Sequence, residues 1–585
     1  MPVFNTVNLI DYGLIGLYFA ILIWVGVFAA RKNTNTDEFF RGGEKVPWVM
    51  AGMSNWVAGF SAFMFVAASG YAYTRGAGTL LIFTSATWAY LVGYWYFAAR
   101  WRRARIKSPL QFLTRRYSHS TTYYYSITSI LPQIVGIGQG LYILCIFIAT
   151  ALGFSERTFV LMGFSLTGLQ ISILIVGAVM VIYTAIGGLW AAVLSDTVQS
   201  IIIATMTLIV FYVSFSYLGR GNGFGAGFVR LFTDAPGGFF RLTGELASPF
   251  FLISYLINAL LGYNVAWGLV QRYNSVPGER DARKMALLCA FLSLVGPLLW
   301  ILPVLGARII FPDINKLWPS LAVPSEASFV SLALMLLPHG MIGFVVSAIL
   351  SATLGHANDT FNWLSATLTR DIYVPLKKRF GGITPTERSQ LVVARTTMFT
   401  VGILGTLVAL YIPRFGGAFR FALEFYSLTA AFMMPVALGM MYTRTPWWSG
   451  MASCTGAIVV ALTLMAMGVW QEDSFSRNML SESIAATVIF FGSAFWFRED
   501  DPRNREVLQF EKDLATPIPT EKARFDPSGF RVYGLLGQIC IVLGIVLTLC
   551  LAVPSTVTAP AIINVVAGVG LVALGIGLLR LSRSA

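Results

Sequence analysis

Residues 340–370 read GMIGFVVSAILSATLGHANDTFNWLSATLTR, a mostly apolar run that carries two ionisable side chains, His356 and Asp359. A helix needs about 20 mostly apolar residues to cross about 30 Å of hydrocarbon. On a helix, a separation of three residues puts His356 and Asp359 on roughly one face. Ionisable groups at membrane depth are costly and usually face a cavity or a partner. The stretch therefore predicts a transmembrane helix that carries part of a functional site.

The whole chain has the composition of a membrane protein. Of its 585 residues, 56% are hydrophobic and 12% are charged, and the mean hydropathy is +0.71, far from the balance of a soluble domain. About fifteen segments are long and apolar enough to cross a membrane, or nearly so. We therefore predict an all-α polytopic membrane protein. The predicted spans are 9–31, 48–70, 77–100, 122–152, 167–187, 190–218, 248–272, 285–311, 340–366, 393–412, 419–443, 447–468, 481–497, 533–552 and 560–580.

Basic residues gather in three loops between these segments, 100–116, 272–284 and 370–379. Lysine and arginine in short loops mark the cytoplasmic side of a membrane protein. Counting the spans in alternation places all three loops inside, the N-terminus outside and the C-terminus in the cytoplasm. The net charge of +14 then reflects topology and attraction to anionic lipid, and no nucleic-acid partner is expected. We expect a multi-pass protein of the inner or plasma membrane whose first segment is a permanent span.

Enzyme and metal motifs are missing from the sequence. It contains no GxSxG, HExxH or phosphate-loop pattern. The five cysteines all fall within predicted spans and lack the CxxC spacing of a metal site. We therefore predict no enzymatic activity and no cofactor other than an ion.

Two predicted spans carry glycine and small polar residues near their middle. They are Met53–Ser61 in the second span and Ile257–Asn264 in the seventh. Five helices separate them, which is the interval between the first helices of two inverted five-helix repeats. Discontinuous helices in corresponding places predict a transporter core with a binding site at the membrane midplane.

The domain organisation follows from these spans and from one long polar interval, 498–531, which contains four prolines and both signs of charge. Such an interval is typical of a solvated linker. The predicted parts are 1–35, an N-terminal extra transmembrane helix; 45–220, the first five-helix repeat; 245–445, the second five-helix repeat; 446–497, additional transmembrane helices; 498–531, a cytoplasmic linker; and 532–585, C-terminal transmembrane helices.

Several local motifs resemble those of the sodium:solute symporter family. Three of them are Asp37–Trp48, Ser108–Tyr117 and Gly187–Gln199. The match covers residues 37–450 and little of the C-terminal remainder. It implies a leucine-transporter-like fold that imports a small polar organic solute by alternating access, usually driven by sodium. The other motifs are Gln271–Tyr273 with Ala282–Lys284, Leu337–Gly340, Asn362 with Thr369–Tyr373, and Met441–Arg444 before Gly450.

The resemblance also implies the positions of an ion site, and this chain departs from the family there. The family binds sodium through backbone carbonyls that align with Val57, Phe60 and Ala352. The two serines that complete the family's site align with Gly355 and His356. Glycine has no side-chain oxygen, and sodium as a hard cation prefers oxygen to an imidazole nitrogen. The coupling ion, sodium or proton or none, is therefore left open.

Asp196 aligns with a family aspartate that contributes to a second sodium site in some relatives. An imidazolium at His356 could occupy the volume of the absent sodium and pair with Asp196, which predicts that the two side chains lie within one water of each other. His356 could instead be satisfied by Asp359 or nearby hydroxyls, or it could contact the solute. A reference pKa of about 6.5 also suits histidine to proton coupling.

The substrate positions are altered as well. Where sugar-transporting relatives have amide and carboxylate side chains, this chain has Gly59, Phe63 and Met64, and Ser293 aligns with a lysine of those relatives. A standard sugar site is therefore not expected. The remaining substrate-binding candidates could equally serve in interhelical hydrogen bonds or packing. They are Ser61, Trp88, Gln133, Gln139, Asn258, Tyr263, Asn264 and Ser293, and Glu424 is a further buried acid that Arg420 could pair with.

The sequence thus predicts a secondary transporter with an altered sodium site. Two alternatives stay open. One is a proton-coupled or sodium-independent transporter that uses His356 and Asp196. The other is a receptor with a transporter fold that binds a solute without moving it, although no signalling domain is appended.

Overall fold

The computed structural model describes most of the chain. Outside the described residues lie 1–3, 6, 31–43, 60, 107–108, 162, 185–188, 242–247, 383–384, 416, 427, 468–473, 519–527, 551–561 and 584–585. The side chains of Ala352, His356, Asp359 and Glu424 also lie outside the described part, although their helices are described.

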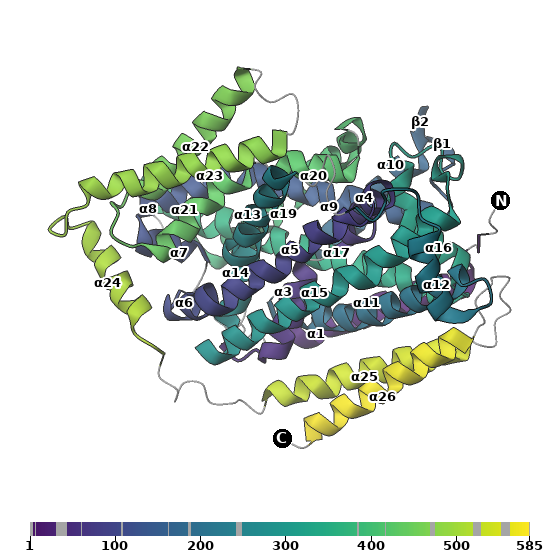
Figure 1. Cartoon of the computed structure of the whole chain (residues 1–585). Helices are drawn as coiled ribbons and strands as arrows, with labels where there is room; N and C mark the ends of the chain where they lie inside the picture. Colours follow the sequence, from purple (N-terminus) through teal and green to yellow (C-terminus); the bar gives the residue numbers. More distant parts are fainter. Residues whose placement is uncertain are drawn as a thin grey trace.

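The described chain is a bundle of long helices (Figure 1). Each of the predicted spans contains a helix, so the all-α class is confirmed. The first half contains α1 (Leu9–Ala30), α3 (Trp48–Ala58), η2 (Ala62–Met64), α4 (Ala67–Arg75), α5 (Gly78–Val92), η3 (Gly93–Phe97), α6 (Ala98–Arg103), α7 (Pro109–Arg116), α8 (His119–Thr128), α9 (Ile130–Ala151), α10 (Gly168–Thr184), α11 (Leu189–Leu218) and α12 (Gly223–Thr233).

The second half repeats this pattern of long helices and short connections. It contains α13 (Pro249–Val265), α14 (Trp267–Ser275), α15 (Glu279–Ile310), η4 (Ile314–Lys316), η5 (Pro324–Ala327), α16 (Ser328–Leu336), α17 (Met341–Ala366), η6 (Thr367–Tyr373), α18 (Val374–Gly381), α19 (Glu387–Tyr411), η7 (Ile412–Phe415), α20 (Ala418–Tyr426), α21 (Thr429–Met441), α22 (Ser449–Ala466), α23 (Ser474–Gly492), η8 (Ser493–Trp496), α24 (Asn504–Ala515), α25 (Ser528–Leu549) and α26 (Ile562–Arg583).

The number of membrane spans is a separate matter. Among the described residues, six helices are long and apolar enough to cross a membrane, or up to eight if each bent pair counts as one span. Several other apolar helices are shorter than a full span, in some cases because part of the segment is not described. The multi-pass class is therefore confirmed, and the count of about fifteen stays a prediction.

Both spans that were predicted to break are bent, although the second break lies at Ala266, just beyond the predicted stretch Ile257–Asn264. The helices Trp48–Ala58 and Ala62–Arg75 meet at 51°, and α13 meets α14 at 44°. At the first break Ser61 has φ 5° and ψ −179°, and its Oγ accepts from Phe63 N at 3.4 Å. At the second break Ala266 is extended, with φ −62° and ψ 130°. The freed backbone groups at such breaks are available to a ligand or a neighbouring helix.

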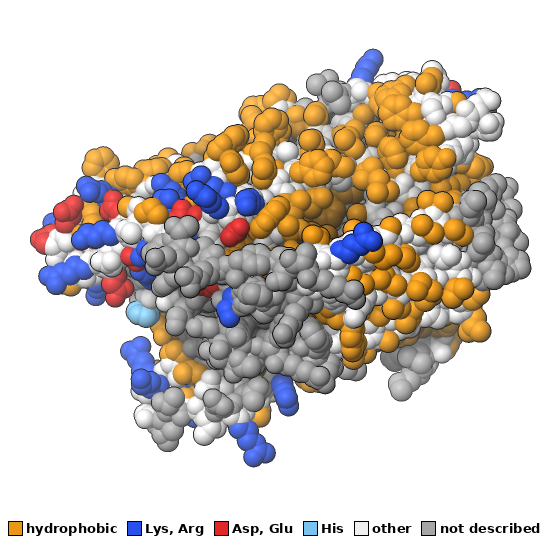
Figure 2. Space-filling model, turned by 90° about the horizontal axis from the view of Figure 1, so that it is seen from below, with side chains coloured by type: hydrophobic (Ala, Val, Ile, Leu, Met, Phe, Trp, Pro, Cys, Tyr) orange, Lys and Arg blue, Asp and Glu red, His pale blue; other side chains and the backbone are white. Residues whose placement is uncertain are grey.

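Charged and apolar side chains occupy different parts of the surface. The basic end, defined by α6, α7 and α24, lies at the left of Figure 1, and the loop end, defined by η5, α16 and the β1–β2 hairpin, lies at the right. Figure 2 shows charged side chains gathered toward the basic end and hydrophobic side chains spread over the rest of the face in view. That distribution suits a protein whose flanks contact lipid.

Two features of the loops go beyond the predicted architecture. A short antiparallel hairpin, β1 (Thr158–Leu161) with β2 (Phe164–Thr167), pairs Thr158 with Thr167. Gly163, with φ +85°, makes its turn.

The interval that the sequence predicts to be a linker contains α24, which packs on the basic loop. Asp513 Oδ1 lies 3.2 Å from Arg105 Nη1, and its other carboxylate oxygen pairs with Arg115. The Phe510 ring packs edge-on against Phe112, with centroids 5.7 Å apart. This helix is therefore part of the folded protein.

The last two helices, α25 and α26, form a hairpin along one side of the bundle (Figure 1). Small residues allow their backbones to approach closely. A Cβ at Gly544 would lie 2.4 Å from the carbonyl oxygen of Gly568, and one at Gly575 would lie 2.6 Å from that of Gly537. Such glycine contacts are the usual way in which helices associate in lipid.

Candidate functional site

The first break lies against α17, the helix that contains His356. Ala62 N, just after the break, donates to Thr353 Oγ1 at 3.3 Å. Thr353 follows Ala352 and precedes Gly355 on α17, and Val57, at the end of α3, is buried. The backbone segments that hold the two halves of the predicted ion site are therefore adjacent.

The ion-site side chains themselves are not all described. Phe60 lies outside the described residues, as do the side chains of Ala352 and His356. The α17 backbone is helical through these positions. The ligands of the ion and the distance from His356 to Asp196 consequently stay predictions.

Asp196, on α11, is buried and bonded to two other helices. Its Oδ2 accepts from Ser54 Oγ of α3 at 2.6 Å and lies 3.1 Å from Arg272 Nη2 of α14. Arg272 Nε also donates to Ser54 Oγ at 3.1 Å. The side chains of Asp196 and Arg272 are 3% and 1% exposed. We call Ser54, Asp196 and Arg272 the ionic triad, and it joins α3, α11 and α14 near the basic end.

The burial of Arg272 corrects one sequence-based assignment. The sequence placed this arginine among the charges of a cytoplasmic loop, but it lies in α14 and its guanidinium is inside the bundle. The feature of the sequence that could have indicated its burial is its place in the family motif Gln271–Tyr273. Removing one partner of a buried ion pair leaves the other charge buried without a counter-charge, which costs about 3–5 kcal/mol of folding free energy.

On the loop-end side of the first break, aromatic rings form a continuous layer. Phe419 of α20 stacks on Tyr71 of α4 at 4.0 Å and on Phe63 of η2 at 6.1 Å, measured between ring centroids. Phe83 of α5 lies edge-on to Phe63 at 6.2 Å and to Tyr255 of α13 at 6.2 Å. We call these five rings the aromatic layer. It closes the site with apolar contacts, in keeping with the apolar residues that the sequence has after the break.

Tyr263, one of the predicted substrate candidates, lies against the first break. A Cβ added at Gly59 would be 2.8 Å from Tyr263 Cε1, so the ring occupies the space that the glycine leaves. The Tyr90 ring of α5 lies 4.9 Å from that of Tyr263. Asn55 Nδ2 of α3 donates to Tyr90 OH at 3.5 Å. Residues from α3, α5 and α13 thus meet between the ionic triad and the aromatic layer.

Three buried oxygen atoms in this region have no hydrogen-bond partner within the described part of the chain. They are Asn55 Oδ1, Asn264 Oδ1 and Tyr273 OH. The amide nitrogen of Asn264, in contrast, donates to the carbonyls of Ala89 and Leu260, each at 2.9 Å. A buried polar atom without a partner costs about 1–3 kcal/mol. The arrangement therefore offers acceptors to water or to a solute that carries N–H or O–H groups.

The remaining candidates occupy different surroundings. Trp88 is 63% exposed on the surface of α5, so the structure does not bring it into the aromatic layer. Gln139 and Ser293 are buried, whereas Ser61, Gln133 and Asn258 are half-buried. A Cβ at Gly140, next to Gln139, would lie 3.7 Å from Thr353 Cγ2, which places that part of α9 beside α17.

The loop end of α17 is held by a carboxylate that the sequence did not single out. Asp11 of α1 is fully buried, and its Oδ1 accepts from Gly340 N at 2.7 Å and Gly343 N at 2.8 Å. Its Oδ2 lies 3.3 Å from His339 Nδ1, and Asn564 Nδ2 of α26 donates to His339 O at 2.9 Å. An acid at a helix N-terminus satisfies free N–H groups and complements the helix dipole. Helices outside the predicted repeats thus fix the position of α17.

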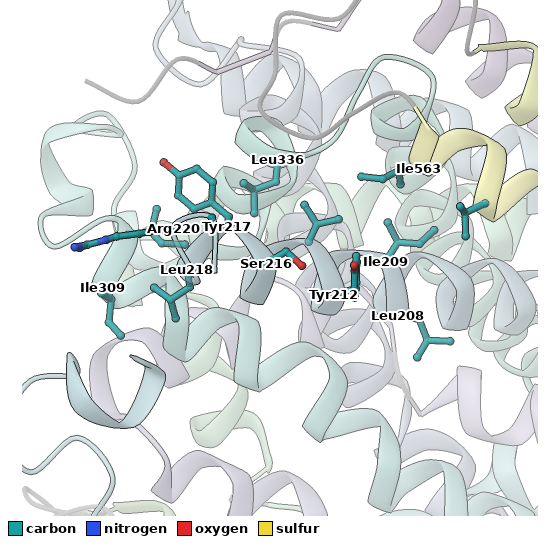
Figure 3. Close-up of a pocket in the computed structure, with 14 residues that line it drawn as sticks. Leu208, Ile209, Tyr212, Ser216, Tyr217, Leu218, Arg220, Ile309, Leu336 and Ile563 are labelled. Atoms are coloured by element: carbon teal, nitrogen blue, oxygen red, sulfur yellow. The ribbon is translucent and has the colours of Figure 1, made fainter. Parts of the chain in front are cut away.

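A large cavity of about 1050 Å³ lies away from these residues (Figure 3). It is a groove between α11 and α26, lined mainly by apolar side chains such as Leu208, Ile209 and Ile563, with Arg220 near one end. It contains none of the predicted substrate candidates. Position relative to the breaks, rather than size, identifies the candidate solute site.

Two helices broken beside a continuous α17 are the arrangement typical of secondary transporters with discontinuous helices. The chain matches the family model "Sodium:solute symporter family" over residues 39–456. It belongs to this family, as its motifs predict, and it is a membrane transporter, not an enzyme.

The relatives are distant and cover most of the chain. A sodium/glucose cotransporter of Vibrio parahaemolyticus is 26% identical over 527 residues, covering 86% of this chain and 93% of its own length. The sodium/sialic acid symporter NanT of Aliivibrio fischeri is 23% identical, covering 83% of this chain and 92% of its own.

A solved structure confirms the fold. It is described as the substrate-bound outward-open state of a Na⁺-coupled sialic acid symporter. It aligns with a TM-score of 0.66 and 18% sequence identity, covering 84% of this chain and 98% of that one. At this identity the likeness establishes the fold alone.

Proposed function

We propose that this chain is a secondary active transporter that imports a small polar organic solute by alternating access, through a sodium site altered by Gly355 and His356. The observation that carries the proposal is the contact of the first break with α17, Ala62 N to Thr353 Oγ1 at 3.3 Å. It brings the first break against the helix of the ion site. Membership of a symporter family supports the same function.

The solute site lies between the ionic triad and the aromatic layer in this proposal. Asn55 Oδ1 offers a hydrogen-bond acceptor on one side, and Phe63 offers an apolar ring on the other. A solute with N–H or O–H groups and one apolar face fits this division. The relatives are named for glucose and sialic acid, but Gly59, Phe63 and Ser293 stand where a sugar site would have polar or charged side chains, which favours a solute with fewer hydroxyl groups.

The charge of Asp196 bears on the coupling ion. In the proposed site its carboxylate faces a guanidinium 3.1 Å away, so Arg272 supplies a resident cation there. A sodium ion at Asp196 would have to compete with that cation. We therefore propose at most one sodium, at the altered site beside α17, and keep proton coupling through His356 as the second candidate, because imidazole changes charge near neutral pH.

The proposed topology places the basic end in the cytoplasm and the loop end outside. Arginine side chains near α6 and α7 and the charged surface of that end in Figure 2 support this orientation. With about fifteen spans, the two five-helix repeats then occupy 45–220 and 245–445. The interval 498–531, including α24, lies on the cytoplasmic side.

Uptake by the purified full chain in proteoliposomes tests the function. Candidate amino acids, amides and small polyols are offered with an inward sodium gradient, an inward proton gradient or neither. Accumulation above the outside concentration in a gradient-dependent manner supports the transporter and identifies its ion. Saturable binding of a solute without accumulation under any gradient would favour the receptor and overturn the proposal.

A further inference from the structure

The short helix α20 separates the aromatic layer from the loop end. It is nine residues long and ends at Tyr426, and α21 begins at Thr429. Its Phe419 ring contributes the stacking contacts to Tyr71 and Phe63 described above. Moving α20 alone would therefore uncover the aromatic layer and the break beneath it.

A buried carboxylate contacts the first turn of α20. Glu326, in η5, is 4% exposed, and its Oε1 accepts from Ala418 N at 2.5 Å. Within the described residues Glu326 makes no ion pair. Its carboxylate therefore interacts with a helix N-terminus, where free N–H groups and the helix dipole favour negative charge.

Glycines on two neighbouring elements make room for this glutamate. A Cβ at Gly70 of α4 would lie 2.9 Å from Glu326 N, and one at Gly417 would lie 2.9 Å from Glu326 Oε1. Gly417 also has φ +103°, a conformation that L side chains rarely adopt. The slot that receives Glu326 is thus built from α4, η5 and the start of α20 together.

A second buried acid lies at the other end of α20. Glu482, on α23, is fully buried in the bundle, and its Oε2 accepts from Ala431 N at 3.0 Å, in the first turn of α21. Three alanines, Ala431, Ala457 and Ala486, pack together around this point. Ionisable side chains at membrane depth are costly and mark functional positions. This contact fixes the start of α21 to α23, a helix outside the region of family resemblance.

In the proposed alternating access, α20 is the lid that opens the solute site toward the loop end. We propose that Glu326 is the latch that holds this lid closed and that Glu482 anchors the hinge at the start of α21. The inference rests on the proposed transport function and adds two positioning residues to it. When the lid opens, the bond from Ala418 N to Glu326 breaks while the bond from Ala431 N to Glu482 persists. The two acids thus have different roles despite the same chemistry.

The latch also makes lid closure depend on pH. Burial raises the pKa of Glu326 to about 7, although N–H bonds from Ala418 and Phe419 lower it. An open lid returns the carboxyl to water, where a glutamate pKa is about 4.3. The closed state therefore binds the proton more tightly. Its advantage is complete below about pH 4 and is lost as the pH rises through about 7.

Few other titratable groups can produce that dependence. Tyr142 of α9 faces Glu326, and it is neutral over this pH range. Among the side chains that the structure describes, the charged residues of the other packed elements are exposed to solvent. They are Arg75 of α4, Arg420 of α20, Lys316 of η4 and Asp313 just before η4.

Thiol labelling of the full chain tests the latch without requiring transport. Ala422, on α20, is fully buried, and Ala422→Cys places a thiol under the lid. Its labelling by a membrane-impermeant maleimide is measured relative to the exposed Asn315→Cys, which corrects for the pH dependence of the reagent. We expect Glu326→Ala to accelerate Ala422→Cys labelling about fivefold at pH 5.5, the effect of losing one hydrogen bond between neutral groups. An unchanged rate would overturn the latch.

Matched variants separate latch, hinge and fold. Glu326→Gln keeps an oxygen acceptor for Ala418 N and loses the titration, so Ala422→Cys should label slowly at pH 5.5 and at pH 8, whereas in the parent it labels faster at pH 8. The same pH response in Glu326→Gln would overturn the role of this carboxyl.

A variant at the second acid tests the hinge. Glu482→Ala should lower the thermal unfolding temperature more than Glu326→Ala does, and it should accelerate labelling less. The reverse order would overturn the hinge assignment. A chain that labels as expected but transports nothing would contradict the proposed function and leave the lid intact.

Discussion

The two sides of the proposed solute site are closed by different forces. Near the basic end, the ionic triad joins α3, α11 and α14 through one buried ion pair and two hydrogen bonds. Near the loop end, the aromatic layer joins α4, α5, α13 and α20 through ring contacts. The stabilisation by a buried ion pair depends steeply on its geometry, and it is lost when either partner is removed. Ring contacts are individually weak and tolerate small displacements, so the aromatic side can open in smaller steps.

The largest effect should come from breaking the ion pair. Asp196→Asn leaves the Arg272 guanidinium buried without its counter-charge, which should cost about 3–5 kcal/mol of folding free energy. Uptake should be lost and the thermal unfolding temperature in detergent should fall. The control is Asp196→Asn combined with Arg272→Gln, which removes both charges and should recover part of the stability. Equal stability of the single variant and the parent would contradict a buried pair.

Weakening the aromatic layer should have a smaller effect, and of a different kind. Phe419→Leu keeps most of the apolar volume but removes two aromatic contacts, each worth about 0.5–1.5 kcal/mol. Labelling of Ala422→Cys should accelerate while the unfolding temperature changes by less than in Asp196→Asn. Phe495→Leu, at a position that is 90% exposed, is the matched control. Equal unfolding temperatures for Phe419→Leu and Asp196→Asn would contradict the proposed difference between the aromatic layer and the ionic triad.

A substitution in α17 tests which cation occupies the proposed ion site between the ionic triad and the aromatic layer. His356→Ser restores the hydroxyl that the family alignment expects, so the sodium concentration for half-maximal uptake should fall about tenfold, or 1.4 kcal/mol. Gly355→Ser is the companion variant at the neighbouring position. Measuring uptake against sodium at fixed pH gives the answer, and identical curves for all three chains would remove the hypothesis of an altered sodium site.

The smallest effect is expected at the surface of the basic end. Asp513→Asn removes the pairing of α24 with Arg105 and Arg115, and partly exposed pairs of this kind contribute about 0.2–1 kcal/mol. Proteolysis of the 498–531 interval should become faster at low salt, and added salt should abolish the difference from the parent. Glu506→Gln, on the same helix, is exposed and without a described ion pair. It should behave as the parent does.

Hydropathy and local motifs were sufficient for the fold because a bilayer leaves few alternatives for an apolar segment. The breaks near Gly59 and Ala266 were also predictable, since glycine and small polar residues were placed at matching points of two spans. The helix α24 was missed because it is amphipathic and rich in charge, and its apolar residue Phe510 finds a partner, Phe112, only in the folded chain.

The site was predicted in part. Family alignment selected Asp196 and the backbone around Thr353, and the structure places these residues in the bundle core. Alignment did not find Arg272 as the partner of Asp196, because counting basic residues in loops assigns a side from residue type and ignores burial. It also did not find Glu326 or Glu482, whose partners are backbone N–H groups on helices far away in sequence.

The sequence by itself determined the class of this protein, a helical transporter of a known family with two broken spans, and it predicts an ion site that lacks the family's hydroxyls. Those properties are local, since they depend on runs of apolar residues and on the identity of side chains at aligned positions. The tertiary structure alone decided which charge faces Asp196, which rings cover the break and which acids hold α20. Such properties depend on contacts between residues separated by tens to hundreds of positions, and only the packing of the helices brings them together.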